Sequence, residues 1–291
     1  MTDFFSAMSS PGMSFLLYAL LIGIIGSVAF GVTGAYVVTR RISSLAGAVA
    51  HCVLGGIGAA LYLRATMGWQ WCHPILGATL SALIAAIIVG LVHLKAKQRE
   101  DTVIGAIWAI GMASGLLFIA CTPGYVSLES YLFGNILLVS KTEFIITLAL
   151  DIIVVTLSAM FYNNFVAVCF DSKFAWLRGL NSDFYYLLLL CIISLTVVLM
   201  VNVVGIIMVI ALLTLPAATA GRFTGRLWSM MILATILSMI FSVSGLVVSY
   251  KMNLPSGPVI VMIAGAVYVI SLFFNGARKR KNNKTTGRNS V

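Results

Sequence analysis

The chain has 291 residues, of which 61% are hydrophobic and 9% are charged, and its formal net charge is +10. Soluble domains carry about 25% charged residues, so this composition excludes an ordinary soluble protein. The basic residues stand in short segments between apolar runs, where they orient membrane proteins, and they form no basic face with interleaved aromatics of the kind that binds nucleic acid.

The N-terminal segment, MTDFFSAMSSPGM, contains the acidic Asp3 and no basic residue. A cleaved signal peptide starts with positive charge, so we expect the first apolar span to stay in the mature protein. Apolar runs then recur along the chain, and most exceed the roughly 20 residues that a helix needs to cross a bilayer. We predict an all-α integral membrane protein with about nine transmembrane helices in one domain, residues 1–275, followed by a basic cytoplasmic tail, residues 276–291.

The nine predicted spans cover residues 14–38, 43–65, 74–94, 103–122, 142–164, 183–203, 205–221, 227–250 and 257–275. The sixth and seventh almost abut near Asn202, and the seventh is short for a full crossing, so it could instead be half of a broken or re-entrant pair. The basic residues set the orientation, because they concentrate in cytoplasmic loops. With the N-terminus outside and the C-terminus inside, fifteen of the eighteen Lys and Arg residues lie on the cytoplasmic side, and Arg64, Lys141 and Lys251 do not.

Two segments between the spans stand out. Residues 122–141, on the outer side, contain a Pro-Gly turn and then a short amphipathic stretch, which indicates a surface helix. Residues 163–181, on the cytoplasmic side, carry Phe174, Leu177 and Leu180 at helical spacing among charged residues. A short helix with such a face either docks on a partner protein or lies on the lipid surface.

Among the His, Asp, Glu, Lys and Arg residues, only His51 and Asp151 stand deep inside predicted spans, away from the span ends. His51 lies in the second span, in a stretch rich in glycine and alanine that allows close helix approach or a cavity. A titratable group at this depth is costly, so it faces a packed interior or an aqueous path, and imidazole is a good ligand for several transition metals. Asp151, in the fifth span, is either a protonated or hydrogen-bonded structural residue or a second group on the same path. His73 and His93 lie at span ends, where imidazole can reach water.

The familiar motifs of enzymes are missing from the sequence. It contains no Gly-Lys dipeptide and hence no P-loop, no HExxH and no GxSxG. The five cysteines are scattered and form no CxxC pair, so neither a zinc ribbon nor a disulfide framework is indicated. We therefore expect a protein that is not an enzyme by itself.

Four segments together resemble the permease subunits of the metal-cation ABC importers, which carry zinc, manganese or iron. They are Arg40-Arg41 followed by Ala50-His51, LFGNILLVS at 132–140, the FD..FA..RGL pattern at 170–180, and GIIMVIALLTLPAATA at 205–220. They occur in the family's order and span nearly the whole chain. The last segment is the most specific.

The resemblance implies the all-helical fold of the vitamin and siderophore (type II) importers, with two permeases, here a homodimer, around a central path. It implies a bacterial cytoplasmic-membrane protein that moves a divalent metal ion inward and binds no permanent cofactor. A separate cytoplasmic ATPase would supply the energy, and an extracytoplasmic binding protein would deliver the metal. Membrane lipid is a further expected partner, and nucleic acid is not.

The resemblance also assigns roles to individual residues. His51 would line the metal path, with Asp151 as a further candidate. The coupling helix that docks on the ATPase would contain Asp171, Phe174, Ala175, Leu177, Gly179 and Leu180. The outer entrance would contain Phe133, Gly134 and Asn135.

The chain departs from the family pattern beside the histidine. Many relatives have an aspartate four residues before it, in a pattern like GDAxSH, and this carboxylate helps to line the path. Here Gly47 takes that position, and Gly55 replaces a proline that is common after the motif. The sequence therefore leaves open which metal is carried.

A second interpretation is an ion-coupled secondary transporter or channel in which Asp151 and His51 form a relay. Such carriers are often built from inverted repeats, and no convincing repeat is present in the sequence. A membrane-embedded enzyme would need a catalytic constellation that the sequence lacks.

Overall fold

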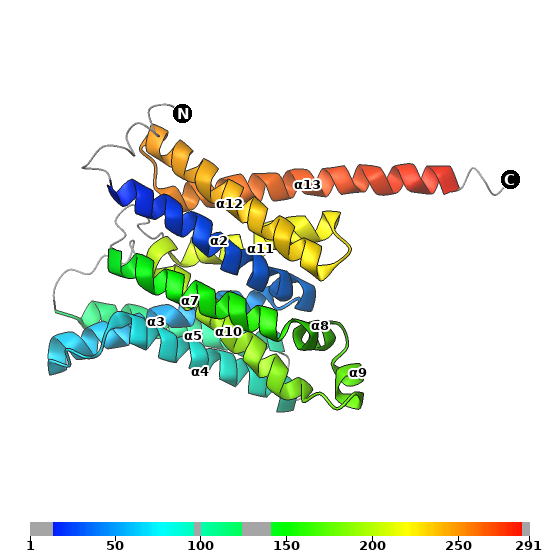
Figure 1. Cartoon of the computed structure of the whole chain (residues 1–291). Helices are drawn as coiled ribbons and strands as arrows, with labels where there is room; N and C mark the ends of the chain where they lie inside the picture. Colours follow the sequence, from blue (N-terminus) through cyan, green and yellow to red (C-terminus); the bar gives the residue numbers. More distant parts are fainter. Residues whose placement is uncertain (1–13, 96–99, 124–140, 287–291) are drawn as a thin grey trace.

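The computed structural model describes residues 14–95, 100–123 and 141–286, and the regular structure in these ranges is entirely α-helical. The helices are α2 (Ser14–Arg40), α3 (Ser43–Met67), α4 (Pro74–Lys95), α5 (Glu100–Cys121), α7 (Lys141–Met160), α8 (Tyr162–Phe170), α9 (Ser172–Leu177), α10 (Ser182–Val204), α11 (Ile206–Phe223), α12 (Leu227–Met252) and α13 (Ser256–Thr286). The long helices run side by side, and α8 and α9 lie together at one end of the bundle (Figure 1). This arrangement is that of a polytopic membrane protein.

Each predicted span coincides with a helix, but not every helix qualifies as a span by length and apolar character. Within the described residues seven helices do, namely α2, α3, α4, α5, α11, α12 and α13. The pair α7 and α8 would make eight, and α10 contributes a shorter apolar stretch over Ser182–Val198. An all-helical membrane protein is thus confirmed, and the count of nine stays a prediction.

The structure shows a break in another predicted span. Helix α11 is an apolar helix of 18 residues that qualifies as a span by itself, and whether residues 205–221 are half of a broken pair stays a prediction. The predicted span over 142–164 ends at Met160, and α8 leaves it at an angle of 69°. Aromatic contacts hold α8 in this direction, because Phe165 packs edge-on against Tyr36 of α2 and against Tyr185 of α10.

The last helix is longer than predicted. Its apolar part covers Ser256–Phe273, but the helix continues to Thr286 and so includes much of the predicted basic tail. In Figure 1 this part extends beyond the bundle at the same end as α8 and α9.

Helix α3 is central to the packing, with extensive contacts to α4 and α5. Glycines make these contacts very close. A Cβ atom at Gly115 of α5 would lie 2.7 Å from the backbone of Leu54, and one at Gly58 of α3 would lie 2.7 Å from the carbonyl oxygen of Gly115. Gly56 of α3 meets the backbone of α4 at Gly77 in the same way. Small residues let membrane helices approach backbone to backbone, so the glycine-rich stretch around His51 serves close packing on this side.

We expect Gly115→Ala to destabilise the bundle, because the added methyl group would overlap the backbone of α3. Overpacking of this kind costs about 1–3 kcal/mol. Gly105→Ala is the matched control on the same helix, since a Cβ atom there meets nothing within 4 Å. Thermal unfolding of the two purified variants checks this, and equal melting temperatures would contradict the packing described.

Candidate metal path and partner-docking end

His51 lies on α3, eight residues after its first residue, which places it about 12 Å along the helix. Its ring is half-buried and stacks on the indole of Trp108 of α5, with the ring centroids 5.0 Å apart and the planes 28° from parallel. The Nδ1 atom is buried and has no hydrogen-bond partner among the described residues. A neutral imidazole carries one acceptor nitrogen, so this ring can accept a hydrogen bond or donate a lone pair to a metal.

Gly47 stands one turn before His51 on the same face of α3. A Cβ atom at Gly47 would meet only the side chain of Ile210 of α11, at an ordinary contact distance of 3.9 Å. Beyond it, Ile207 of α11 is 40% exposed, and Trp108 is 49% exposed. The face of α3 that carries Gly47 and His51 is therefore only partly covered within one chain, unlike its glycine-packed faces.

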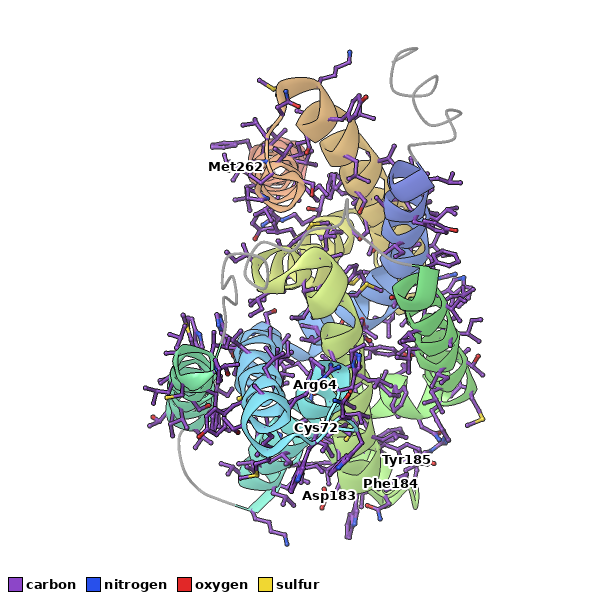
Figure 2. All side chains as sticks on the ribbon, turned by 90° about the vertical axis from the view of Figure 1, so that its left-hand side faces the viewer. Arg64, Cys72, Asp183, Phe184, Tyr185 and Met262 are labelled. Carbon is purple, nitrogen blue, oxygen red and sulfur yellow. The ribbon has the colours of Figure 1, made fainter. Side chains whose placement is uncertain are left out.

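Asp151 lies on the other side of the bundle. It is 5% exposed on α7, close to the backbone of Ala29 of α2, and its Oδ1 atom has no hydrogen-bond partner among the described residues. Figure 2 looks at the bundle from one end and shows α5 and α7 at opposite edges. The structure thus places His51 and Asp151 in different helix pairs and does not bring them together.

The described part of the chain contains no group of three or more His, Cys, Asp or Glu side chains that could hold a metal ion. A metal ion beside His51 would need ligands in addition to those that the described residues offer. A site of this kind suits a passing ion better than a resident one.

The segment predicted to couple to a partner forms a short helix, α9, with a well-defined start. The Asp171 side chain accepts hydrogen bonds from the backbone amides of Lys173 and Phe174, at 3.0 and 2.9 Å. This is an N-cap, which satisfies amides that the first turn leaves unpaired. Ala175 is buried at 1% exposure and anchors the helix, and the Ser182 hydroxyl of α10 donates to the Ser172 carbonyl at 2.8 Å.

The predicted helix is too long at its C-terminal end. Helix α9 ends at Leu177, and Gly179 has a φ of 83°, a left-handed conformation that turns the chain back. Leu180 follows this turn and packs, partly buried, against the core, so it does not share a face with Phe174 and Leu177. The spacing of the apolar residues predicted a longer helix, because it does not show that Gly179, two residues after Leu177, ends the helical periodicity.

Four large side chains at this end are exposed, and we call them the α9 knob: Phe170 at 68%, Phe174 at 54%, Trp176 at 69% and Leu177 at 74%. Phe170 belongs to the FD..FA..RGL pattern but was not assigned to the predicted docking helix, and neither was Trp176, although two more bulky aromatics in a charged segment were a usable signal. Arg178 lies over the Phe174 ring at 5.4 Å.

Phe133, Gly134 and Asn135 of the predicted outer entrance lie outside the described residues.

Comparison with known proteins identifies the chain's relatives. The sequence profile of the ABC 3 transport family matches residues 12–275. The chain belongs to this family. The resemblance drawn from its motifs is therefore confirmed, and a protein of this family is a transporter permease rather than an enzyme by itself.

Individual members of the ABC 3 transport family agree with this placement. The chain is 38% identical to a probable metal transport system membrane protein of Chlamydia trachomatis, over 93% of this chain and 92% of that protein. It is 34% identical to the manganese transport system membrane protein MntC of Listeria monocytogenes, over 90% and 91% of the two chains. The chain is also similar to the solved structure of PsaBC from Streptococcus pneumoniae in complex with Fab. The TM-score is 0.81 and the sequence identity is 30%, and the match covers 93% of this chain and 94% of that chain.

A cluster at the α9 end of this ABC 3 chain was not foreseen from the sequence. The guanidinium of Arg40 lies 5.4 Å from the centre of the Tyr186 ring, and His93 packs on the same ring at 4.6 Å. The cluster joins the ends of α2, α4 and α10 beside α8 and α9. It shows that the first residue of the Arg40-Arg41 motif has a packing role in addition to its charge.

We expect Asp171→Ala to loosen the start of α9 without unfolding the bundle, because the substitution removes both capping hydrogen bonds. Loss of an N-cap costs about 1 kcal/mol, so the amides of Lys173 and Phe174 should exchange with solvent about five times faster. Asp171→Asn is the matched control, since an asparagine side chain caps equally well. Hydrogen exchange read by mass spectrometry measures both variants, and unchanged exchange in Asp171→Ala would contradict the cap.

Proposed function

We propose that this chain is the membrane-spanning permease of an ABC importer that moves a divalent transition-metal ion into the cytoplasm of a bacterium. The observation that carries the proposal is the half-buried imidazole of His51, stacked on Trp108, on a face of α3 that a single chain leaves partly uncovered. Membership in the ABC 3 transport family supports it, as do relatives named for metal and manganese transport. The chain crosses the membrane nine times, with its N-terminus outside and its C-terminus inside.

Two copies of the chain form the path. The partly covered face with Gly47, His51 and Trp108 meets its own copy across a two-fold axis, so that two imidazoles replace the usual pair of histidine and aspartate from each chain. Two nitrogen ligands and water hold an ion loosely, which favours passage. Imidazole suits zinc and iron, whereas manganese prefers oxygen ligands, so all three metals are candidates and manganese, named in relatives, is the first to test.

A separate ATPase drives the movement, and the α9 knob is its docking surface. Exposed aromatic side chains such as Trp176 at this end of the bundle are typical interface anchors. Helix α9 is joined to α10 through the Ser182–Ser172 hydrogen bond, and α10 packs on α3, which carries His51. When the ATPase closes around ATP, it shifts the permease between outward-open and inward-open states. This requires that the closed ATPase binds the two states of the permease with different affinity. An extracytoplasmic binding protein delivers the metal to the opposite end.

The secondary-transporter interpretation is less well supported, because it needs Asp151 and His51 in one relay. The two residues belong to different helix pairs, α2 with α7 and α3 with α5.

We expect His51→Phe to reduce metal uptake by cells at least about tenfold, since a phenyl ring keeps the stack on Trp108 but cannot bind a metal ion. His73→Phe is the matched control, because it removes an exposed imidazole at the end of a predicted span. Uptake of manganese, zinc and iron is measured at equal amounts of permease in the membrane. If uptake of all three metals by His51→Phe equals that of the unmodified protein, His51 is not on the path.

We expect the double substitution Phe174→Ala with Leu177→Ala to release the ATPase, weakening its association by about thirtyfold or more. Phe223→Ala is the control, since Phe223 is an equally exposed aromatic, 56%, at the end of α11 outside the knob. Co-purification of a P-loop ATPase with the tagged permease reads the outcome. Retention of the ATPase by the double variant would show that the knob contacts lipid instead.

A further inference from the structure

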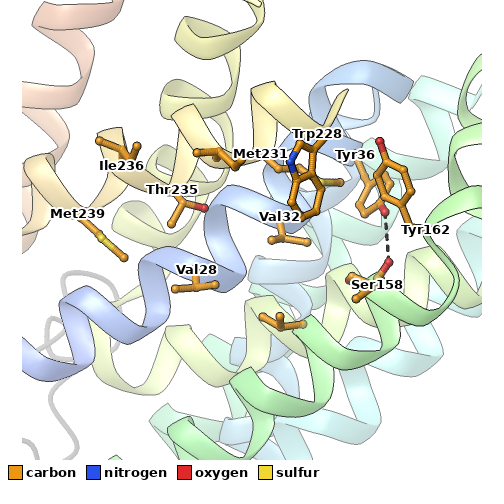
Figure 3. A pocket seen from close by; sticks show the side chains of 13 residues that line it. Val28, Val32, Tyr36, Ser158, Tyr162, Trp228, Met231, Thr235, Ile236 and Met239 are labelled. Atoms are coloured by element: carbon orange, nitrogen blue, oxygen red, sulfur yellow. Dashed lines mark hydrogen bonds between the residues drawn. The ribbon is translucent and has the colours of Figure 1, made fainter. Parts of the chain in front are cut away.

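A groove on the surface of the bundle, away from His51, has no role in the proposed transport. It runs between α2, α7 and α12 and has a volume of about 350 Å³. Val28, Val32, Val155 and Met239 line it, and Ile232 and Ile236 are part of its exposed rim (Figure 3). Such a volume is within the range of small-molecule sites, and the lining is almost wholly apolar.

We propose that this groove binds one acyl chain of an anionic phospholipid, with the phosphate at the N-terminus of α12. The length of the groove favours a lipid chain. It extends from Val28 to Tyr36 on α2 and from Trp228 to Met239 on α12, which corresponds to about 12–17 Å of helix. Half of a bilayer's hydrocarbon core is about 15 Å thick, whereas a transmembrane helix of a partner would need a groove of about 30 Å.

Apart from the Thr235 hydroxyl of α12, the polar side chains that line the groove lie at one end of it. There the Tyr36 hydroxyl donates to the Ser158 carbonyl at 3.4 Å, and Tyr162 packs edge-on against Trp228 at 6.1 Å. The Ser158 hydroxyl is buried and has no hydrogen-bond partner among the described residues. Aromatic pairs of this kind mark the level of the lipid head groups, so the head group of a lipid whose chain lies in the groove belongs at this end.

Positive charge lies at the same end. Arg226 is exposed directly before α12, and within the described ranges no side chain caps the first turn of this helix. The free amides of a helix N-terminus and a neighbouring guanidinium together bind phosphate. Arg41, exposed after α2, adds to the positive field. With the proposed orientation this lipid belongs to the inner leaflet, and its chain lies beside Tyr162 at the bend between α7 and α8.

Native mass spectrometry of the full-length permease tests the proposal. The protein is purified in mild detergent with equal amounts of phosphatidylglycerol and phosphatidylcholine. We expect one retained phospholipid per chain, with phosphatidylglycerol preferred. Val155→Trp, which fills the groove, should lower retention about tenfold, and Arg226→Gln should abolish the preference for phosphatidylglycerol.

Ile152→Trp is the matched control, because Ile152 is exposed on α7 outside the groove. It should retain lipid like the unmodified protein, and all variants must elute as monodisperse species. Equal retention by Val155→Trp and the unmodified protein would overturn the proposal. The proposal would also be overturned if the groove held a second copy of the chain instead of a lipid. In that case Val155→Trp would dissociate a dimer and leave the amount of retained lipid unchanged.

Discussion

The backbone contact between α3 and its two neighbours sets the position of the candidate metal path. Gly58 and Gly115 bring α3 and α5 together with no side chain between them, and Gly56 and Gly77 do the same for α3 and α4. Since these faces are closed by backbone atoms, the face with Gly47 and His51 is the one that stays partly open. The closeness of α5 also brings Trp108 over the imidazole, and this stack orients the ring on the partly open face.

The same structure connects the candidate path to the α9 end of the bundle without a large domain. Helix α8 leaves α7 at 69° and is held by Tyr36 and Tyr185, so α9 is presented at the end of the bundle on packed aromatic supports. The Asp171 cap and buried Ala175 keep the short helix in place, because six residues alone do not form a stable helix in water. Rigid support of this kind is what a surface needs in order to transmit the motion of a docked partner.

Much of this could be predicted from the sequence, and the failures have physical causes. Apolar runs located each long helix, and a lone imidazole in such a run marked His51. The end of α9 was missed because the backbone turn at Gly179 overrides the spacing of Leu180. The separation of Asp151 from His51 could not be read from the chain, since it depends on which helices pack together. The groove of α2, α7 and α12 has no signature in the sequence, because three distant segments line it.

The central claim is that ATP hydrolysis on a partner drives metal through this chain, and transport by purified components tests it most directly. The permease, its ATPase and its binding protein are placed in liposomes with ATP enclosed, and manganese, zinc and iron are compared. The account predicts that metal accumulates only when ATP, the ATPase and the binding protein are all present. Accumulation by the permease alone, driven by an ion gradient, would contradict it.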